Sequence, residues 1–82
     1  MEHKYNNDFP YYRKLSNNKS FYKILDDKNF EEIQILGSKK NHFKHFAEQY
    51  PEMLRIQDMI NLHGEHYLNI EKEEWELLLS VE

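Results

Sequence analysis

The chain of 82 residues contains no cysteine and no long apolar run, since the longest uninterrupted run covers residues 77–79. The absence of cysteine excludes disulfide bonds, thiolate-held zinc and a cysteine nucleophile, and it favours a reducing compartment. We therefore expect the protein in the cytoplasm. Because no long apolar run is present, we expect neither a signal peptide nor a membrane span.

Glycine is also scarce. The two glycines, Gly37 and Gly64, cannot build a glycine-rich loop that cradles phosphate, and no serine stands in a GxSxG or SxxK context. A chain of this length has little room for a cleft that excludes water from a substrate. We therefore predict that the protein is not an enzyme and holds no cofactor.

The residues that are present suit one small core. Apolar residues make up 39% of the chain and aromatic residues 15%, so a few large rings can supply much of the buried area. Residues 1–9 are polar, rich in asparagine and without periodicity. We predict a disordered N-terminal tail over residues 1–9 and a single small α+β domain over residues 10–82.

Charge is distributed unevenly along the chain. Residues 1–45 carry nine Lys or Arg and six Asp or Glu, a net +3, whereas residues 46–82 carry two and nine, a net −7. Such segregation bears on partners rather than on fold. An acidic second half makes nucleic acid an unfavourable partner for it and favours a basic protein surface.

Alternating apolar and polar residues predict strands in the first half. PYYRKLS, SFYKIL and FEEIQIL are separated by NNK at 17–19 and DDKN at 26–29, which are turn signals, and Gly37 follows the last of them. Links this short join antiparallel neighbours. We predict a three-stranded antiparallel β-meander over residues 11–36.

The spacing changes after residue 39 and predicts one or two helices over residues 40–62. Asn41 is the expected N-cap, Pro51 ends the first helix or begins a second, and Gly64 is the expected stop. Residues 51–62 fit either a helix or a strand, and we favour the helix. The apolar face of the first helix consists of Phe43, Phe46, Ala47 and Tyr50.

The final segment predicts an amphipathic helix over residues 70–81, capped by Asn69 and packed on the sheet through Trp75, Leu78 and Leu79. The predicted fold is therefore α+β: a three-stranded antiparallel β-meander, one or two helices, and a C-terminal amphipathic helix that covers the sheet. An uncovered sheet edge would also favour a homo-oligomer.

Two histidine pairs, HFKH at 42–45 and HGEH at 63–66, raise the hypothesis of a metal site. On a helix, residues three apart share a face, so the first pair could hold one ion together with the second. Four imidazoles are an unusual zinc set, and HExxH is not present, so exposed histidines are the simpler interpretation. The candidate metal ligands are His42, His45, His63 and His66.

The first two predicted strands combine aromatic and basic residues, as single-stranded nucleic-acid binders do. A half-buried sheet uses the same residue types for packing and solubility, so nucleic-acid binding is the alternative function rather than the preferred one. The candidate contacts are Tyr12, Arg13, Lys14, Lys19, Tyr22 and Lys23.

Carboxylates concentrate in EKEEWE and just before it. Acid–base catalysis would need one of them in an apolar setting, whereas glutamates in the first turn of an amphipathic helix are usually solvated. We therefore predict a non-catalytic protein-interaction module or small inhibitor that binds a basic partner surface, including one that normally holds nucleic acid. The candidate partner-binding residues are Glu65, Glu71, Glu73, Glu74 and Glu76.

Overall fold

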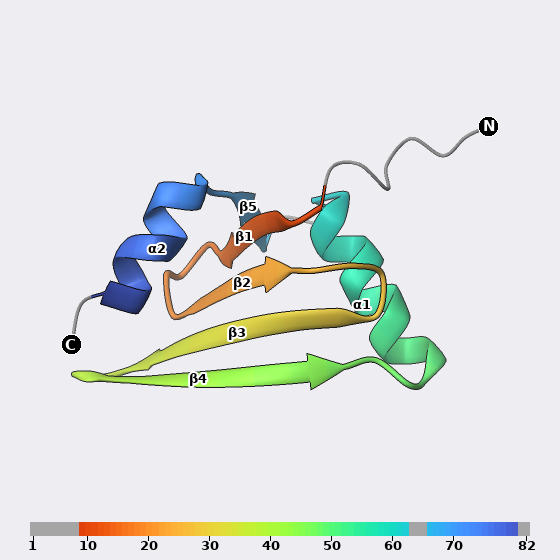
Figure 1. Ribbon diagram of the computed structural model, residues 1–82, viewed down its shortest axis with the longest axis horizontal. Coiled ribbons are helices and arrows are strands. Elements are labelled where there is room, and N and C mark those ends of the chain that lie inside the picture. The colour runs from red at the N-terminus through yellow and green to blue at the C-terminus, as the bar shows by residue number, and fades with distance from the viewer. Residues whose placement is uncertain (1–8, 63–65, 81–82) are drawn as a thin grey trace.

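The computed structural model describes residues 9–62 and 66–80, and it confirms the α+β class (Figure 1). Its strands form one five-stranded antiparallel sheet in the order β4-β3-β2-β1-β5. The elements are β1 (Tyr11–Leu15), β2 (Ser20–Ile24), β3 (Asn29–Leu36), β4 (Lys39–Phe46), α1 (Tyr50–Ile60), β5 (Tyr67–Asn69) and α2 (Lys72–Ser80).

The predicted meander is real but longer than expected, because β1, β2 and β3 are followed by a fourth hairpin-linked strand. Gly37, at φ 64°, and Ser38 make the two-residue turn between β3 and β4. A positive φ at the first turn position is the geometry that favours glycine in such hairpins.

The predicted helix over the residues before Pro51 is wrong, since β4 pairs with β3 from Leu36↔Lys39 to Asn29↔Phe46. The helical spacing of its aromatic residues was coincidental: Phe43 and Phe46 are 41% and 56% exposed. Asn41 lies inside the strand and caps nothing. Backbone pairing along the whole strand outweighs the weak local helix preference of this segment.

Helix α1 confirms the preferred interpretation of the next segment. Pro51 occupies its first turn, where the missing N–H leaves no bond unmade, and Ile56 and Met59 are buried against the sheet. The helix is followed by Asn61 at the C-cap, and the proposed stop at Gly64 lies outside the described residues.

The C-terminal helix is also confirmed, as α2, although it begins later than predicted. Asn69 does not cap it, because this residue belongs to β5, which pairs with β1, and its Oδ1 accepts a hydrogen bond from Arg13 Nη1 at 2.7 Å. Trp75 is buried and Leu78 half-buried against the sheet, as predicted, whereas Leu79 is 47% exposed.

The two helices lie on opposite faces of the sheet. Neighbouring residues of a strand point to opposite sides, and two neighbours on β2 pack against different helices. Tyr22 belongs to the cluster that contains Ile56 and Met59 of α1, whereas Phe21 belongs to the cluster that contains Trp75 of α2. Within the described residues no helix is both long and apolar enough to cross a membrane. The first cluster contains Tyr22, Ile24, Phe30, Ala47, Ile56 and Met59, and the second contains Phe21, Ile33, Ile70 and Trp75.

The turn between β2 and β3 depends on Asp26. Its Oδ1 accepts hydrogen bonds from the backbone N–H of Lys28 and of Asn29, both at 2.8 Å. Partial desolvation would raise the pKa of this carboxyl, but these hydrogen bonds outweigh it and lower the pKa of Asp26 below its usual value of 3.8. The folded state therefore favours the ionised form.

We expect Asp26→Ala to lower the free energy of unfolding at neutral pH by about 1 kcal/mol. Because the folded-state pKa is depressed, this contribution is complete above the unfolded-state pKa and is lost as the pH falls through the folded value. Urea denaturation at neutral pH and at about pH 2.5 measures the difference, which should narrow in acid. The neighbouring Asp27→Ala is the control, and an equal loss in that variant, or a gap independent of pH, would refute the assignment.

Candidate functional site

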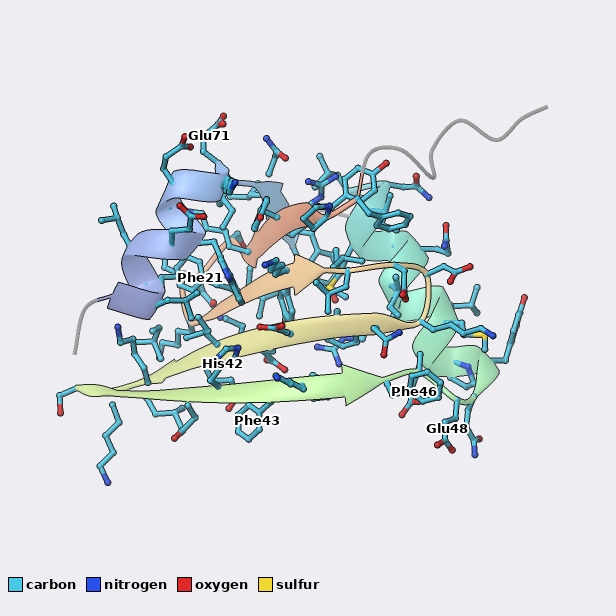
Figure 2. All side chains as sticks on the ribbon, viewed as in Figure 1. Phe21, His42, Phe43, Phe46, Glu48 and Glu71 are labelled. Atoms are coloured by element: carbon cyan, nitrogen blue, oxygen red, sulfur yellow. The ribbon has the colours of Figure 1, made fainter. Side chains whose placement is uncertain are left out.

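Helix α2 buries one side and presents carboxylates on the other. Trp75 is 1% exposed, while Glu71, Glu73 and Glu76 lie at the surface. The acidic residues of the first turn stabilise the helix because they lie at the positive end of its dipole. Glu71 lies just before α2, at the far end from the hairpin turn (Figure 2). Three of the five predicted partner-binding residues, Glu73, Glu74 and Glu76, thus lie on α2, and Glu71 lies just before it. Glu65 lies outside the described residues.

Two of these carboxylates have cationic neighbours. Glu74 Oε2 lies 3.9 Å from Lys14 Nζ of β1, and Glu76 Oε2 lies 3.9 Å from Lys72 Nζ one helical turn earlier. Exposed pairs of this kind contribute about 0–1 kcal/mol and exchange readily for other partners. The acidic face therefore stays available for a basic surface.

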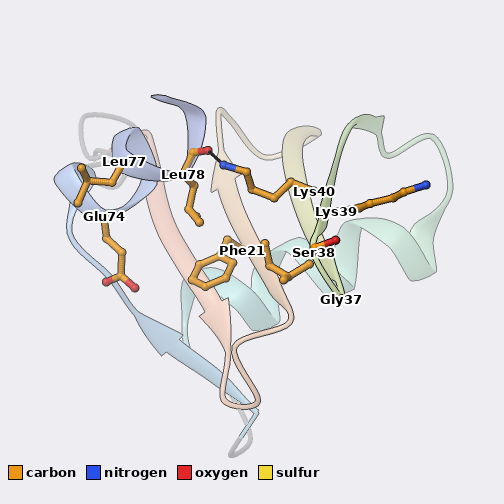
Figure 3. Close-up of a pocket in the computed structure, with 9 residues that line it drawn as sticks. Phe21, Gly37, Ser38, Lys39, Lys40, Glu74, Leu77 and Leu78 are labelled. Atoms are coloured by element: carbon orange, nitrogen blue, oxygen red, sulfur yellow. Dashed lines mark hydrogen bonds between the residues drawn. The ribbon is translucent and has the colours of Figure 1, made fainter. Parts of the chain in front are cut away.

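An apolar groove runs beside α2, between the helix and the β3–β4 hairpin, with a volume of about 380 Å³ (Figure 3). Lys40 Nζ donates a hydrogen bond to Leu78 O, which ties the hairpin to the last turn of the helix and places a cation at its negative end. Leu77, on the rim, is 62% exposed. The lining residues are Phe21, Ile35, Gly37, Ser38, Lys39, Lys40, Glu74, Leu77 and Leu78.

Sequence reasoning did not find this groove. The hairpin wall of the groove exists only because β3 pairs with β4. The prediction ended the meander at residue 36 and placed Lys40 in a helix, so no hairpin was expected opposite α2. A signal was present in the three consecutive leucines at 77–79, which exceed what one buried helical stripe needs.

The histidine pair of β4 does not share a face, so the geometry assumed for the metal hypothesis is wrong. Residues three apart on a strand point to opposite sides. His42 Nε2 lies 2.8 Å from Glu31 Oε1 and its ring meets Trp75, whereas His45 Nε2 lies 3.0 Å from Glu32 Oε1 on the α1 face.

The second histidine pair adds little to a metal site. His66 uses its backbone carbonyl to accept a hydrogen bond from Ser16 N at 2.8 Å, and His63 lies outside the described residues. Across residues 9–62 and 66–80 no three potential metal ligands come together.

The six residues proposed for nucleic acid are divided between the faces of the sheet. Arg13 and Tyr22 are buried on the α1 side, at 6% and 1% exposure, and cannot stack on bases there. Tyr12 packs near Trp75, with ring centroids 6.4 Å apart, and Lys14 pairs with Glu74 on the α2 side.

The remaining two of the six do not restore a common platform. Lys19 is exposed in the β1–β2 turn, and Lys23 is half-buried opposite Tyr12. The six residues therefore do not form one exposed platform.

A buried carboxylate that the sequence did not reveal lies under the α1 face. Glu32 is 4% exposed and accepts a hydrogen bond from Gln34 Nε2 at 3.1 Å, in addition to its contact with His45. Desolvation, and then the negative charge of Glu32, raise the pKa of Tyr22. The Tyr22 hydroxyl accepts a hydrogen bond from Arg55 Nη2 at 3.2 Å.

This polar network resembles an acid–base pair in its residue types, but it has no room for a substrate. The cavity beside His45 and Arg55 holds about 50 Å³, enough for a water molecule or two, whereas ligand sites span roughly 300–1,000 Å³. Arg55 stacks its guanidinium over the rings of Tyr22 and Phe30, 5.6 Å from each centroid. The network therefore stabilises the contact between α1 and the sheet.

Comparison of the chain with protein-family models, with curated proteins and with solved structures gives no match. The function must therefore be inferred from the geometry of the described residues.

Proposed function

We propose that the chain is a non-catalytic protein-interaction module, or small inhibitor, in which α2 and the groove beside it bind a basic partner surface. The observation that carries this proposal is the outer face of α2. Glu73, Glu76 and Leu77 are spaced three and four residues apart and so share that face. Leu77 is 62% exposed there, at the rim of the apolar groove.

A solvated helix needs no exposed leucine beside its carboxylates, whereas a protein-binding surface uses both. Interfaces typically place an apolar anchor in a pocket and surround it with polar residues. Carboxylates around such an anchor steer a basic partner toward it and fix its orientation. A partner segment with basic residues along α2 and an apolar side chain in the groove would satisfy both features.

The proposal predicts that charge on α2 controls affinity. We expect the triple variant Glu71→Gln, Glu73→Gln and Glu76→Gln to bind the partner about tenfold more weakly, since each exposed charge contributes roughly 0.5 kcal/mol. Glu74 is left unchanged because it pairs with Lys14. Capture from a lysate of the source cells identifies the partner, and calorimetric titration at two salt concentrations measures affinity.

A triple variant with the same charge change elsewhere is the matched control. Asp27→Asn, Glu48→Gln and Glu52→Gln remove three exposed carboxylates outside α2, and this variant should bind within about twofold of the wild type. The proposal fails if both triple variants lose affinity equally. It also fails if the α2 variant binds normally at low salt.

A further inference from the structure

The outer side of β4 is the long edge of the sheet. β4 ends the strand order, and within the described residues no strand pairs with its far side. The opposite edge, β5, has three residues, whereas β4 has eight. A long edge offers a row of backbone N–H and C=O groups to another strand.

The backbone groups on that outer side can be assigned from the hydrogen bonds. Ala47 N donates to Lys28 O at 2.7 Å, so the residue just after β4 points its amide toward the β3 side. In an antiparallel ladder the direction alternates with each residue. The N–H and C=O groups of Lys40, His42 and Lys44 therefore point away from β3.

The edge is basic. β4 has the sequence KKNHFKHF, with three lysines, two histidines and no acidic residue. Its charge is offset only in part from β3, where Glu31 contacts His42 and Glu32 contacts His45. Phe43 is 41% exposed and projects beyond the outer edge of β4 (Figure 2).

Charge makes a second copy of the chain a poor occupant of this edge. Antiparallel self-pairing centred on His42 places Lys40 opposite Lys44 of the other copy. Self-pairing centred on Lys44 places Lys44 opposite its own copy. Like charges directly opposite each other destabilise a strand pair, and lysine on an edge is a common barrier to self-association.

We propose that the outer edge of β4 binds an extended acidic segment of a partner protein, which adds a sixth strand to the sheet. Main-chain hydrogen bonds to His42 and Lys44 hold the segment. Its carboxylates lie along the basic side chains, and an apolar residue packs on Phe43. Lys40 borders both this edge and the groove beside α2, whereas Lys44 does not line that groove, so variants at Lys44 test the edge separately from the function proposed for α2.

The probe is a synthetic, end-capped peptide of eight residues in which glutamate alternates with valine, and one of the valines is replaced by phenylalanine. Titration followed by amide NMR should show saturable binding, with the outward amides of His42 and Lys44 shifting and becoming protected from exchange. The same peptide with lysine in place of glutamate should not bind. A probe methylated at alternate backbone nitrogens, which keeps every side chain, should lose at least about tenfold in affinity.

Two variants at Lys44 separate side chain from backbone. Lys44→Ala should bind the acidic probe about threefold more weakly, whereas Lys44→Pro, which also removes the outward N–H, should bind about tenfold more weakly than Lys44→Ala. The N-methylated probe gives the same answer without a protein variant if the proline variant does not fold. The proposal is overturned by no saturable binding at low salt, by equal affinity of the two variants or the two probes, or by shifts confined to α2. Self-association of the wild type that Lys44→Pro abolishes would overturn it in favour of a second copy.

Discussion

Replacing Trp75 with alanine is expected to lower the free energy of unfolding by about 3–5 kcal/mol, the largest effect of any single substitution proposed for this chain. The indole is 1% exposed and forms the second core cluster with Phe21, Ile33 and Ile70. Helix α2 has nine residues, too few for a helix to persist in water without tertiary packing. The loss should therefore include the helical signal of α2, and the proposed partner surface with it.

Circular dichroism during urea denaturation measures this loss. Tryptophan fluorescence cannot be used, because Trp75 is the single tryptophan and the variant lacks it. Trp75→Phe is the matched control. Among the described residues the indole Nε1 is buried without a hydrogen-bond partner, so phenylalanine loses area but removes an unpaired donor, and should cost only about 1 kcal/mol. A loss below about 1 kcal/mol in the alanine variant would contradict the role given to this residue.

Arg13→Met is expected to cost about 2–3 kcal/mol. Arg13 is 6% exposed, and its Nε and Nη2 each donate a hydrogen bond of 2.8 Å, to Met59 O and Ile60 O at the end of α1. That helix has no basic residue in its own last turn. β1 thus supplies the cation that the negative end of the helix dipole favours.

Arg13→Met should lower the stability because the hydrogen-bond acceptors around Arg13 stay buried after the guanidinium is removed. Desolvation lowers the pKa of Arg13, but a guanidinium keeps its charge at neutral pH. Removing it takes the guanidinium donor from Ile60 O and Asn69 Oδ1 and leaves Met59 O with the backbone N–H of Leu62. This differs from replacing both members of an ion pair by apolar groups. Arg13→Lys should recover only part of the lost stability. An ammonium restores the charge but lacks the planar fork that reaches several acceptors at once. Urea denaturation measures the stability of both variants, and hydrogen exchange reports the last turn of α1. A neutral Arg13→Met would contradict this account.

The sequence predicted the elements that depend on local patterning. Alternation and turn chemistry placed β1, β2 and β3, and a proline at its start together with an apolar stripe placed α1. The helix predicted before Pro51 was wrong because the spacing of its aromatic residues fits a helix as well as a strand. Only the pairing of β4 with β3 decides between the two. The C-terminal helix was predicted to begin at residue 70 and begins at Lys72, and three of the candidate glutamates, Glu73, Glu74 and Glu76, lie on it.

The parts of the candidate surfaces that were not predicted depend on contacts between distant segments. The groove requires the β3–β4 hairpin to lie opposite α2. Burial of Glu32 requires His45 on the neighbouring strand, and Arg13 changes from a candidate nucleic-acid ligand to a helix cap only when α1 packs on β1. No local pattern encodes these pairings, since each joins residues more than ten positions apart.

The most direct test of the central proposal, that α2 and its groove form the partner-binding surface, is photo-crosslinking from two exposed leucines. Leu77 on α2 and Leu54 on α1 are 62% and 45% exposed. Each is replaced in turn by a photoreactive phenylalanine analogue, and the adducts formed in a lysate of the source cells are identified by mass spectrometry. We predict one dominant adduct with a basic protein from position 77, competed by unlabelled wild type, and none from position 54. Adducts with the same protein from both positions, or from position 54 alone, would contradict the account.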